Sequence, residues 1–253
     1  MELIQQPLLM FAAAFLALWL ASFTGVWLHR RYPRAEDEQH EDLGIILGAS
    51  LTLLALIIGF SVSMASTRYD QRKNLEEAEA NAIGTEILRA DLLPPPDAAN
   101  VRSLLGAYLD QRILFFINQD DTRQPQIDQA TRQLQTNLWA AVRGAAAVQP
   151  TPVAALVLAG MNDVINSQGY TQAAFWNRIP PGVRWLMTAI ALCSNLLFGF
   201  RSRDGRAARK LSLVLPFIVS MAFLLIADID SPRHGLIHVS PLNLENLAKS
   251  LGH

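Results

Sequence analysis

The sequence predicts an all-α integral membrane protein with four membrane-spanning helices and a helical extramembrane module. First, 51% of its 253 residues are hydrophobic and 17% are charged, below the ~25% charged residues of ordinary soluble domains. Second, its longest apolar run passes into a charged, helix-favouring sequence without a proline. Third, apolar residues in the middle of the chain recur with the helical period, and we find no strand-like alternation. The net charge of −1 gives no reason to expect a nucleic-acid partner.

Four apolar runs are long enough to cross the ~30 Å hydrocarbon core of a bilayer as helices. They are residues 8–28, 43–66, 183–200 and 211–227. The first run is longer than the apolar core of a signal peptide and no Lys or Arg precedes it, so we expect it to be retained. Pro216 predicts a kink in the fourth.

The second run is the start of a helix that we expect to extend from Leu43 to Leu93. Its apolar part ends at Ser66, and the charged residues that follow contain no proline until Pro94–Pro96. Small residues recur along one side of this apolar part every three or four positions. They are Gly44, Gly48, Thr52, Ala55, Gly59, Ser63 and Ser66. This small-residue stripe favours either close helix packing in lipid or the lining of a pore between protomers.

Residues 67–182 are predicted to form the extramembrane module. Asp97 is a candidate cap for a helix whose apolar positions run from Val101 to Phe116. Two further amphipathic helices are expected around Ile127–Val142 and Val153–Ile165. Residues 228–253 are expected to be a short C-terminal tail.

Two groups of charged or metal-binding residue types have competing interpretations. The acidic residues that follow the second apolar run are Asp70, Glu76, Glu77, Glu79 and Glu86. They form rings at a pore mouth if several protomers surround one axis. Alternatively, they pair with nearby basic residues on the protein surface. Asp228, Asp230, His234 and His238 have the side chains of metal ligands. However, Pro232 and Gly235 break the helical register between them, so we expect no metal site there and an interfacial role for Asp228.

The distribution of positive residues predicts an orientation in the membrane. The two short loops, after residues 28 and 200, hold more Lys and Arg than the opposite side, which favours placing them in the cytoplasm with both termini and the module outside. Labelling single cysteines in a variant without Cys193 tests this orientation.

Three segments carry a resemblance to a known family. Gly59-Phe60, followed by Arg68-Tyr69, is similar to the pattern at the inner part of the second helix of bestrophins. The block Glu79–Thr85 (Glu-Ala-Asn-Ala-Ile-Gly-Thr) and Asp230-Ser231-Pro232 resemble the bacterial bestrophin-like family of domains of unknown function. The resemblance extends from Gly44 to Pro241, so the whole chain is treated as one bestrophin-like unit.

This resemblance implies a pentamer whose second helices surround a pore, with an extramembrane part that extends the ion path. The chain departs from bestrophins in its short region after the fourth run, in a neck reduced to Phe60 among aliphatic residues, and in the predicted side of its module. The first departure puts the calcium clasp of animal bestrophins in doubt.

We therefore expect a bacterial, multi-pass inner-membrane protein that forms a homo-oligomeric channel for small ions, anions rather than cations. The alternative is a non-conducting membrane scaffold or regulatory subunit. We find no nucleophile motif and no zinc-helix pattern, so we expect neither an enzyme nor a cofactor. The pore-lining candidates are Gly48, Thr52, Ala55, Ile57, Gly59, Phe60 and Ser63. The pore-mouth candidates are Arg68, Asp70, Arg72, Glu77 and Asn81.

Overall fold

The computed structural model describes residues 7–31, 37–148, 150–201 and 212–252, with the backbone alone at 7 and at 37–41. Within these ranges the elements are helices: α1 (Pro7–Arg31), α2 (Asp37–Ala90), α3 (Pro95–Ile117), α4 (Gln124–Val148), α5 (Pro152–Trp176), α6 (Pro181–Arg201), α8 (Val214–Asp230) and α9 (Leu242–Ser250). The all-α fold class is confirmed.

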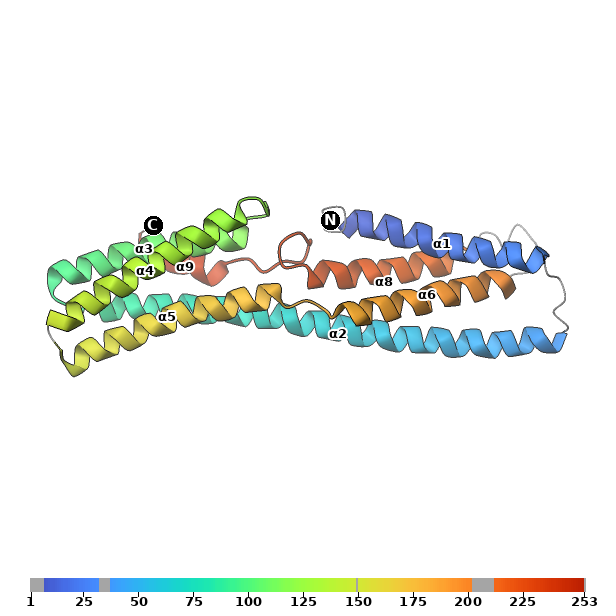
Figure 1. Ribbon diagram of the computed structural model, residues 1–253, viewed down its shortest axis with the longest axis horizontal. Helices are drawn as coiled ribbons and strands as arrows, with labels where there is room; N and C mark the ends of the chain where they lie inside the picture. The colour runs from blue at the N-terminus through green and yellow to red at the C-terminus, as the bar shows by residue number, and fades with distance from the viewer. Residues whose placement is uncertain (1–6, 32–36, 149, 202–211, 253) are drawn as a thin grey trace. The chain divides into compact units, whose positions relative to one another are not determined.

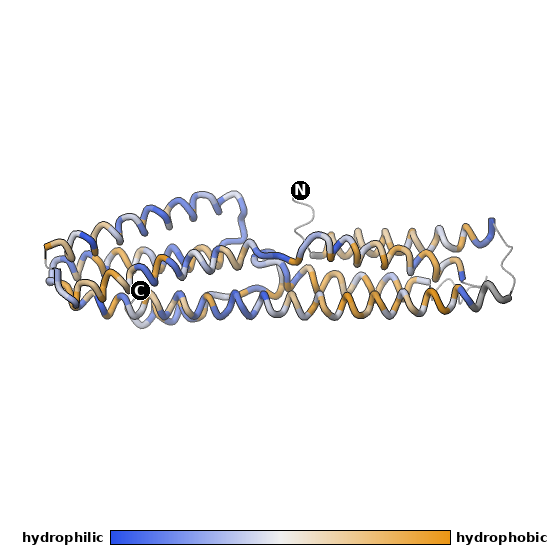
Figure 2. The backbone as a smooth tube through the Cα atoms, turned by 60° about the horizontal axis from the view of Figure 1, so that its bottom comes forward, coloured by the Kyte–Doolittle hydropathy of each residue, from blue (hydrophilic) through white to orange (hydrophobic). Residues whose placement is uncertain are grey.

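The helices form two compact units, which share α2 (Figure 1). The first, called the apolar unit, consists of Met1–Thr67 with Arg178–Ile237. The second, called the module, consists of Arg68–Asn177 with His238–His253. Figure 2 shows that hydrophobic residues dominate the helices of the apolar unit, whereas hydrophilic and hydrophobic residues alternate along those of the module.

In the apolar unit, α1 packs against both α6 and α8. Two glycines allow α1 and α6 to approach closely, because a Cβ atom on Gly25 would lie 2.1 Å from the carbonyl oxygen of Leu196. A Cβ atom on Gly199 would lie 1.9 Å from the carbonyl oxygen of Ser22. Close packing through small residues is therefore a property of α1 and α6.

Three helical stretches of the described chain are long and apolar enough to cross a membrane: Leu8–Arg31, Asp42–Ala90 and Pro152–Arg201, the last of which contains the break between α5 and α6. They contain the first three runs expected from the sequence. The fourth corresponds to α8, whose 17 residues are about 25 Å long at 1.5 Å per residue. Leu211, where we expected that run to begin, lies outside the described residues. The number of four crossings therefore stays a prediction.

The long second helix is present as α2, which has 54 residues and a length of about 80 Å. It ends at Ala90, three residues before the expected end, because the amides of Leu92 and Leu93 already turn back to the carbonyls of Arg89 and Ala90. Pro95 then occupies the first turn of α3, where a proline is tolerated because no helical partner awaits its missing N–H.

In the module, α3 packs against α4, α4 against α5, and α9 against α3. Their shared core contains the aromatic residues Tyr108, Phe115, Phe116 and Phe175 and aliphatic residues of all five helices, including Ile83 of α2. The segment expected to be a tail thus contributes a helix, α9, to this core.

Two helix starts in the module differ in how they are capped. Asp97 lies within the first turn of α3 and Pro94 holds the cap position without a side-chain hydrogen bond, so Asp97 is not the cap that the sequence suggested. Its charge still favours the helix N-terminus. At α5, the Thr151 hydroxyl accepts a hydrogen bond from the amide of Ala154, 3.1 Å away.

A buried ion pair joins three helices of the module. Arg112 of α3 donates hydrogen bonds from Nε and Nη2 to the carboxylate of Glu79 of α2, and neither side chain is exposed. The Thr171 hydroxyl of α5 donates to the same carboxylate over 2.8 Å. The guanidinium of Arg112 also lies 4.3 Å from the centre of the Phe115 ring, which is a favourable cation–π distance.

We predict that Glu79→Ala lowers the free energy of unfolding by about 3–5 kcal/mol, because it leaves the buried charge of Arg112 without its partner. Unfolding of the purified protein, followed by circular dichroism, measures this. Glu77→Ala, on the exposed side of the same helix, serves as the control and should change stability by no more than ~0.5 kcal/mol. Equal stability of the two variants would contradict the structural role of the pair.

Candidate functional site

Helix α2 has one buried face along both units. Every three, four or seven residues a side chain of this face is buried, which is the spacing of one side of a helix. In the apolar unit the buried positions are Leu47, Leu54, Ser61 and Ala65. In the module they are Arg72, Glu76, Glu79, Ile83, Glu86 and Ala90.

The small-residue stripe lies on the opposite, exposed face of α2. Five of the seven pore-lining candidates are exposed there: Gly48, Thr52, Ala55, Gly59 and Ser63. A Cβ atom added to Gly48 or Gly59 would meet no other atom of the described residues within 4 Å. The hydroxyl of Thr52 is satisfied by the Gly48 carbonyl of its own helix, 2.9 Å away. Packing inside the protomer therefore does not account for these small residues.

The remaining members of the pore-lining set lie beside the stripe. The Phe60 side chain is 69% exposed, whereas Ile57 is half-buried and stands closer to the buried face. Gly44, the first residue of the stripe, is covered by the guanidinium of Arg201 from α6, so the exposed face begins at Gly48.

The pore-mouth candidates divide between the two faces of α2. Asp70, Glu77 and Asn81 are exposed and continue the stripe along the module. Arg72 is 1% exposed and donates hydrogen bonds to the carbonyls of Ala174 and Asn177, at 3.2 and 3.3 Å.

Arg68 is half-buried and lies one turn before Arg72 on the same face. Arg72 thus lies in the interior of the module, and Arg68 stands on the same side of α2. Arg72 places a positive charge at the carbonyl end of α5, where the helix dipole favours it.

Three of the acidic residues singled out from the sequence form neither a surface ring nor exposed ion pairs, because Glu76, Glu79 and Glu86 are buried. Glu76 accepts hydrogen bonds from the amides of Asn243 and Leu244, at 2.9 and 3.0 Å, and thereby holds the N-terminus of α9. The signal that would have indicated their burial is spacing: they share the face of Ile83 and Ala90 at intervals of three and four.

The two aspartates after the last long helix bind backbone amides. Asp228 accepts hydrogen bonds from the amides of Leu236 and Ile237, at 2.7 and 3.0 Å. Asp230 accepts one from the amide of Ile179, at 3.0 Å. Both residues are 5% exposed, so Asp228 fixes the loop after α8. Within the described ranges, no three His, Cys, Asp or Glu residues come together as a metal site.

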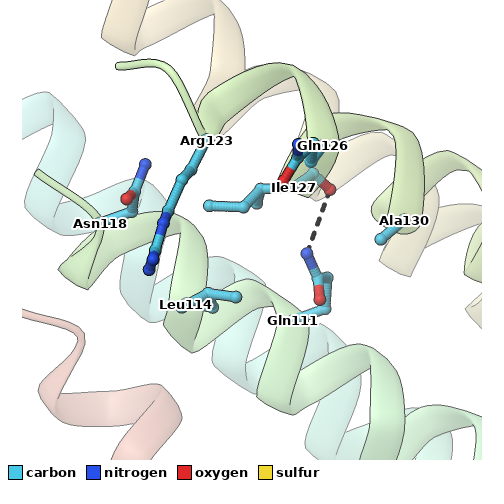
Figure 3. Close-up of a pocket in the computed structure, with 7 residues that line it drawn as sticks. All are labelled: Gln111, Leu114, Asn118, Arg123, Gln126, Ile127 and Ala130. Carbon is cyan, nitrogen blue, oxygen red and sulfur yellow. Dashed lines mark hydrogen bonds between the residues drawn. The ribbon is translucent and has the colours of Figure 1, made fainter. Parts of the chain in front are cut away.

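A pocket of about 420 Å³ lies between the end of α3 and the start of α4 (Figure 3). Gln111 at its wall donates a hydrogen bond to the carbonyl of Ile127 over 3.2 Å, and Asn118 donates to the carbonyl of Asp120 over 2.9 Å. The Arg123 side chain is 74% exposed and its Nε lies 3.7 Å from the Asp120 carboxylate. Because these lining groups bind neighbouring protein groups, we assign the pocket no ligand.

The chain matches the model of the Bestrophin-like domain over residues 16–244. It is also similar to the crystal structure of a bacterial bestrophin homologue from Klebsiella pneumoniae, with 14% identity, a TM-score of 0.66, and coverage of 95% of this chain and 96% of that chain. Two variants of that homologue match with 14% identity and TM-scores of 0.66 and 0.64; 95% of this chain is covered in both, with 97% and 93% of the respective other chains. No curated protein matches.

The structural matches show the fold, and the domain match covers most of the chain. Fold and family together indicate an integral membrane location. On the strength of the match over residues 16–244, the chain belongs to the Bestrophin-like family.

Proposed function

We propose that this protein is a homo-oligomeric ion channel, a pentamer as the family resemblance implies, with the exposed face of α2 around the pore. The observation that carries the proposal is the line of small and polar residues from Gly48 to Ser63 on the face opposite the protomer core. Such a face suits a narrow lumen, because small side chains leave space and Thr and Ser contribute hydroxyl oxygens.

A lipid-facing role explains this stripe less well. The apolar side chains that α2 exposes beside it, such as Leu53 and Leu56, suit contact with lipid or a neighbouring protomer. A face that holds Thr52 and Ser63 instead offers lipid little apolar surface. Phe60 and Ile57, at its edge, are proposed to form the hydrophobic constriction that gates the path.

The exposed face of α2 supports cations rather than anions as the conducted ions. The resemblance implied anions, but Arg68 and Arg72 stand on the inward side and the exposed charges that continue the stripe are Asp70 and Glu77. Lys73 lies beside them, so each protomer places two carboxylates and one ammonium group on this side. Rings of Asp and Glu are typical of cation-conducting pores.

The second candidate function is a non-conducting membrane scaffold or regulatory subunit. The exposed face of α2 is compatible with this function if it binds a second copy of the chain without enclosing a pore.

We propose no enzymatic activity for this protein. We place the protein in the inner membrane of a bacterium, with the module outside as the distribution of Lys and Arg predicts.

We predict that the protein purified in gentle detergent has a mass five times that of the 27.9 kDa chain. One protomer is too small to enclose a pore in this fold, and the family resemblance implies a pentamer. Native mass spectrometry in detergent and in lipid nanodiscs measures this. A monomer or dimer under both conditions would rule out the pentameric pore and leave the scaffold.

We predict that Gly59→Leu reduces ion flux into proteoliposomes on the order of tenfold, because every protomer then adds a bulky apolar group to the lumen. The protomer tolerates the change, since a Cβ atom at Gly59 meets no described atom within 4 Å and leucine favours a helix more than glycine. Ala189→Leu, on an exposed position of α6, is the matched control. Equal flux through the two variants, each assembled as the wild type, would place the pore elsewhere.

We predict that Asp70→Asn combined with Glu77→Gln lowers the permeability ratio of potassium to chloride by at least about twofold, since a charge ~8 Å from an ion contributes roughly 0.5–2 kcal/mol. Reversal potentials in a potassium chloride gradient measure the ratio. Asp110→Asn combined with Asp121→Asn removes the same charge at exposed positions outside α2 and should leave the ratio unchanged. Chloride preference in the wild type would refute the cation assignment.

A further inference from the structure

One buried carboxylate of the module stands apart from the others. Glu86 of α2 is 0% exposed, and neither of its carboxylate oxygens has a hydrogen-bond partner among the described residues. Glu76 and Glu79 on the same face accept hydrogen bonds from α9, α3 and α5. A buried carboxylate without hydrogen bonds is much more costly when charged than when protonated.

The space that Glu86 occupies is created by a glycine of α5. A Cβ atom on Gly160 would lie 1.9 Å from Oε2 of Glu86 and 2.2 Å from Nη1 of Arg89. Even a methyl group at this position would collide with the carboxyl group. The carboxyl group is therefore enclosed between α2 and the backbone of α5.

Two charged groups act on Glu86. On its own helix, Nη1 of Arg89 lies 3.9 Å from Oε2, longer than the ~2.9 Å of a hydrogen bond, and the Arg89 side chain is 27% exposed. On α5, the negative charge of Asp163 disfavours ionisation of Glu86. Burial is the largest effect, ahead of the opposing Arg89 and of Asp163, and it raises the pKa of Glu86 from 4.5 to about 8.

We propose that Glu86 is a proton-binding site, and that release of its proton to solvent loosens the packing of α5 against α2 at Gly160. With the proton bound, the neutral carboxyl group fits the enclosed space between the two helices. Without it, the carboxylate must reach water or draw in Arg89, and either movement displaces the backbone of α5. The module thereby responds to a rise in pH. This inference depends on the module alone and holds whether or not the protein conducts ions.

The direction of the pH dependence follows from proton linkage. Between pH 4.5 and about 8 the folded module retains a proton that the opened module releases, so the stability of the α2–α5 contact falls as the pH rises. The opening equilibrium is expected to increase by up to about tenfold per pH unit in this interval. Above about pH 8 both states are ionised, and the equilibrium no longer changes through this group.

The first experiment observes the proton directly in the full-length protein. Infrared spectra with isotope-labelled glutamate should show the C=O band of a protonated carboxyl group at neutral pH, and the band should disappear as the pH rises through about 8. Glu86→Gln should lack this band, whereas Glu77→Gln, at an exposed position of the same helix, should keep it. Absence of the band in the wild type, or its persistence in Glu86→Gln, would overturn the proposal.

The second experiment measures the consequence for α5. Hydrogen exchange of the amides of Pro152–Trp176, corrected for the intrinsic effect of pH, should lose protection with rising pH in the wild type and in Glu77→Gln. In Glu86→Gln the protection should not depend on pH. An identical pH dependence in the wild type and Glu86→Gln would refute the coupling. If Glu86→Gln does not fold, the wild-type infrared titration still decides whether the proton is bound.

Discussion

The structure of the module depends on charged residues that α2 carries into its interior. A buried charge without a partner costs several kcal/mol. Each buried charged residue of α2 therefore needs a group of opposite charge or a hydrogen-bonding group beside it. Glu79 requires the guanidinium of Arg112, Arg72 requires the carbonyls that end α5, and Glu76 requires the amides that begin α9. These interactions determine which helices pack against α2 and at which residues of α2 they do so. Apolar packing alone is less selective, because it is non-directional.

In the apolar unit too, α2 buries one face, with Leu54 and Ser61, and leaves the opposite face exposed. Since the interior accepts one side of the helix, the small and polar residues from Gly48 to Ser63 must contact something else. By contrast, Gly25 and Gly199 serve the close packing of α1 against α6. Glycines of the apolar unit therefore have different roles, depending on whether another helix of the protomer packs against them. Because the small residues of α2 do not serve packing inside the protomer, their exposed face is a candidate for the ion path.

Acidic residues of one helix acquire different chemistry from their surroundings. Glu77 is exposed to solvent, Glu79 is neutralised by an arginine, and Glu86 is enclosed beside Gly160 without a hydrogen bond. At the third position burial opposes ionisation and raises the pKa of Glu86. An exposed carboxylate is suited to act on passing ions, whereas an enclosed one is suited to report pH through the packing of the helices around it.

The sequence by itself determined the helical elements, because apolar length, helix propensity and proline positions act locally: α2 ends close to Pro94, and α6 begins at Pro181. It also identified the family through the segments around Gly59, Glu79 and Asp230. Only the tertiary structure decided that Arg72 points inward and that Glu86 is enclosed, since their neighbours come from helices some 75 to 100 positions away along the chain. Burial of a charged side chain depends on those distant partners, which no local pattern specifies.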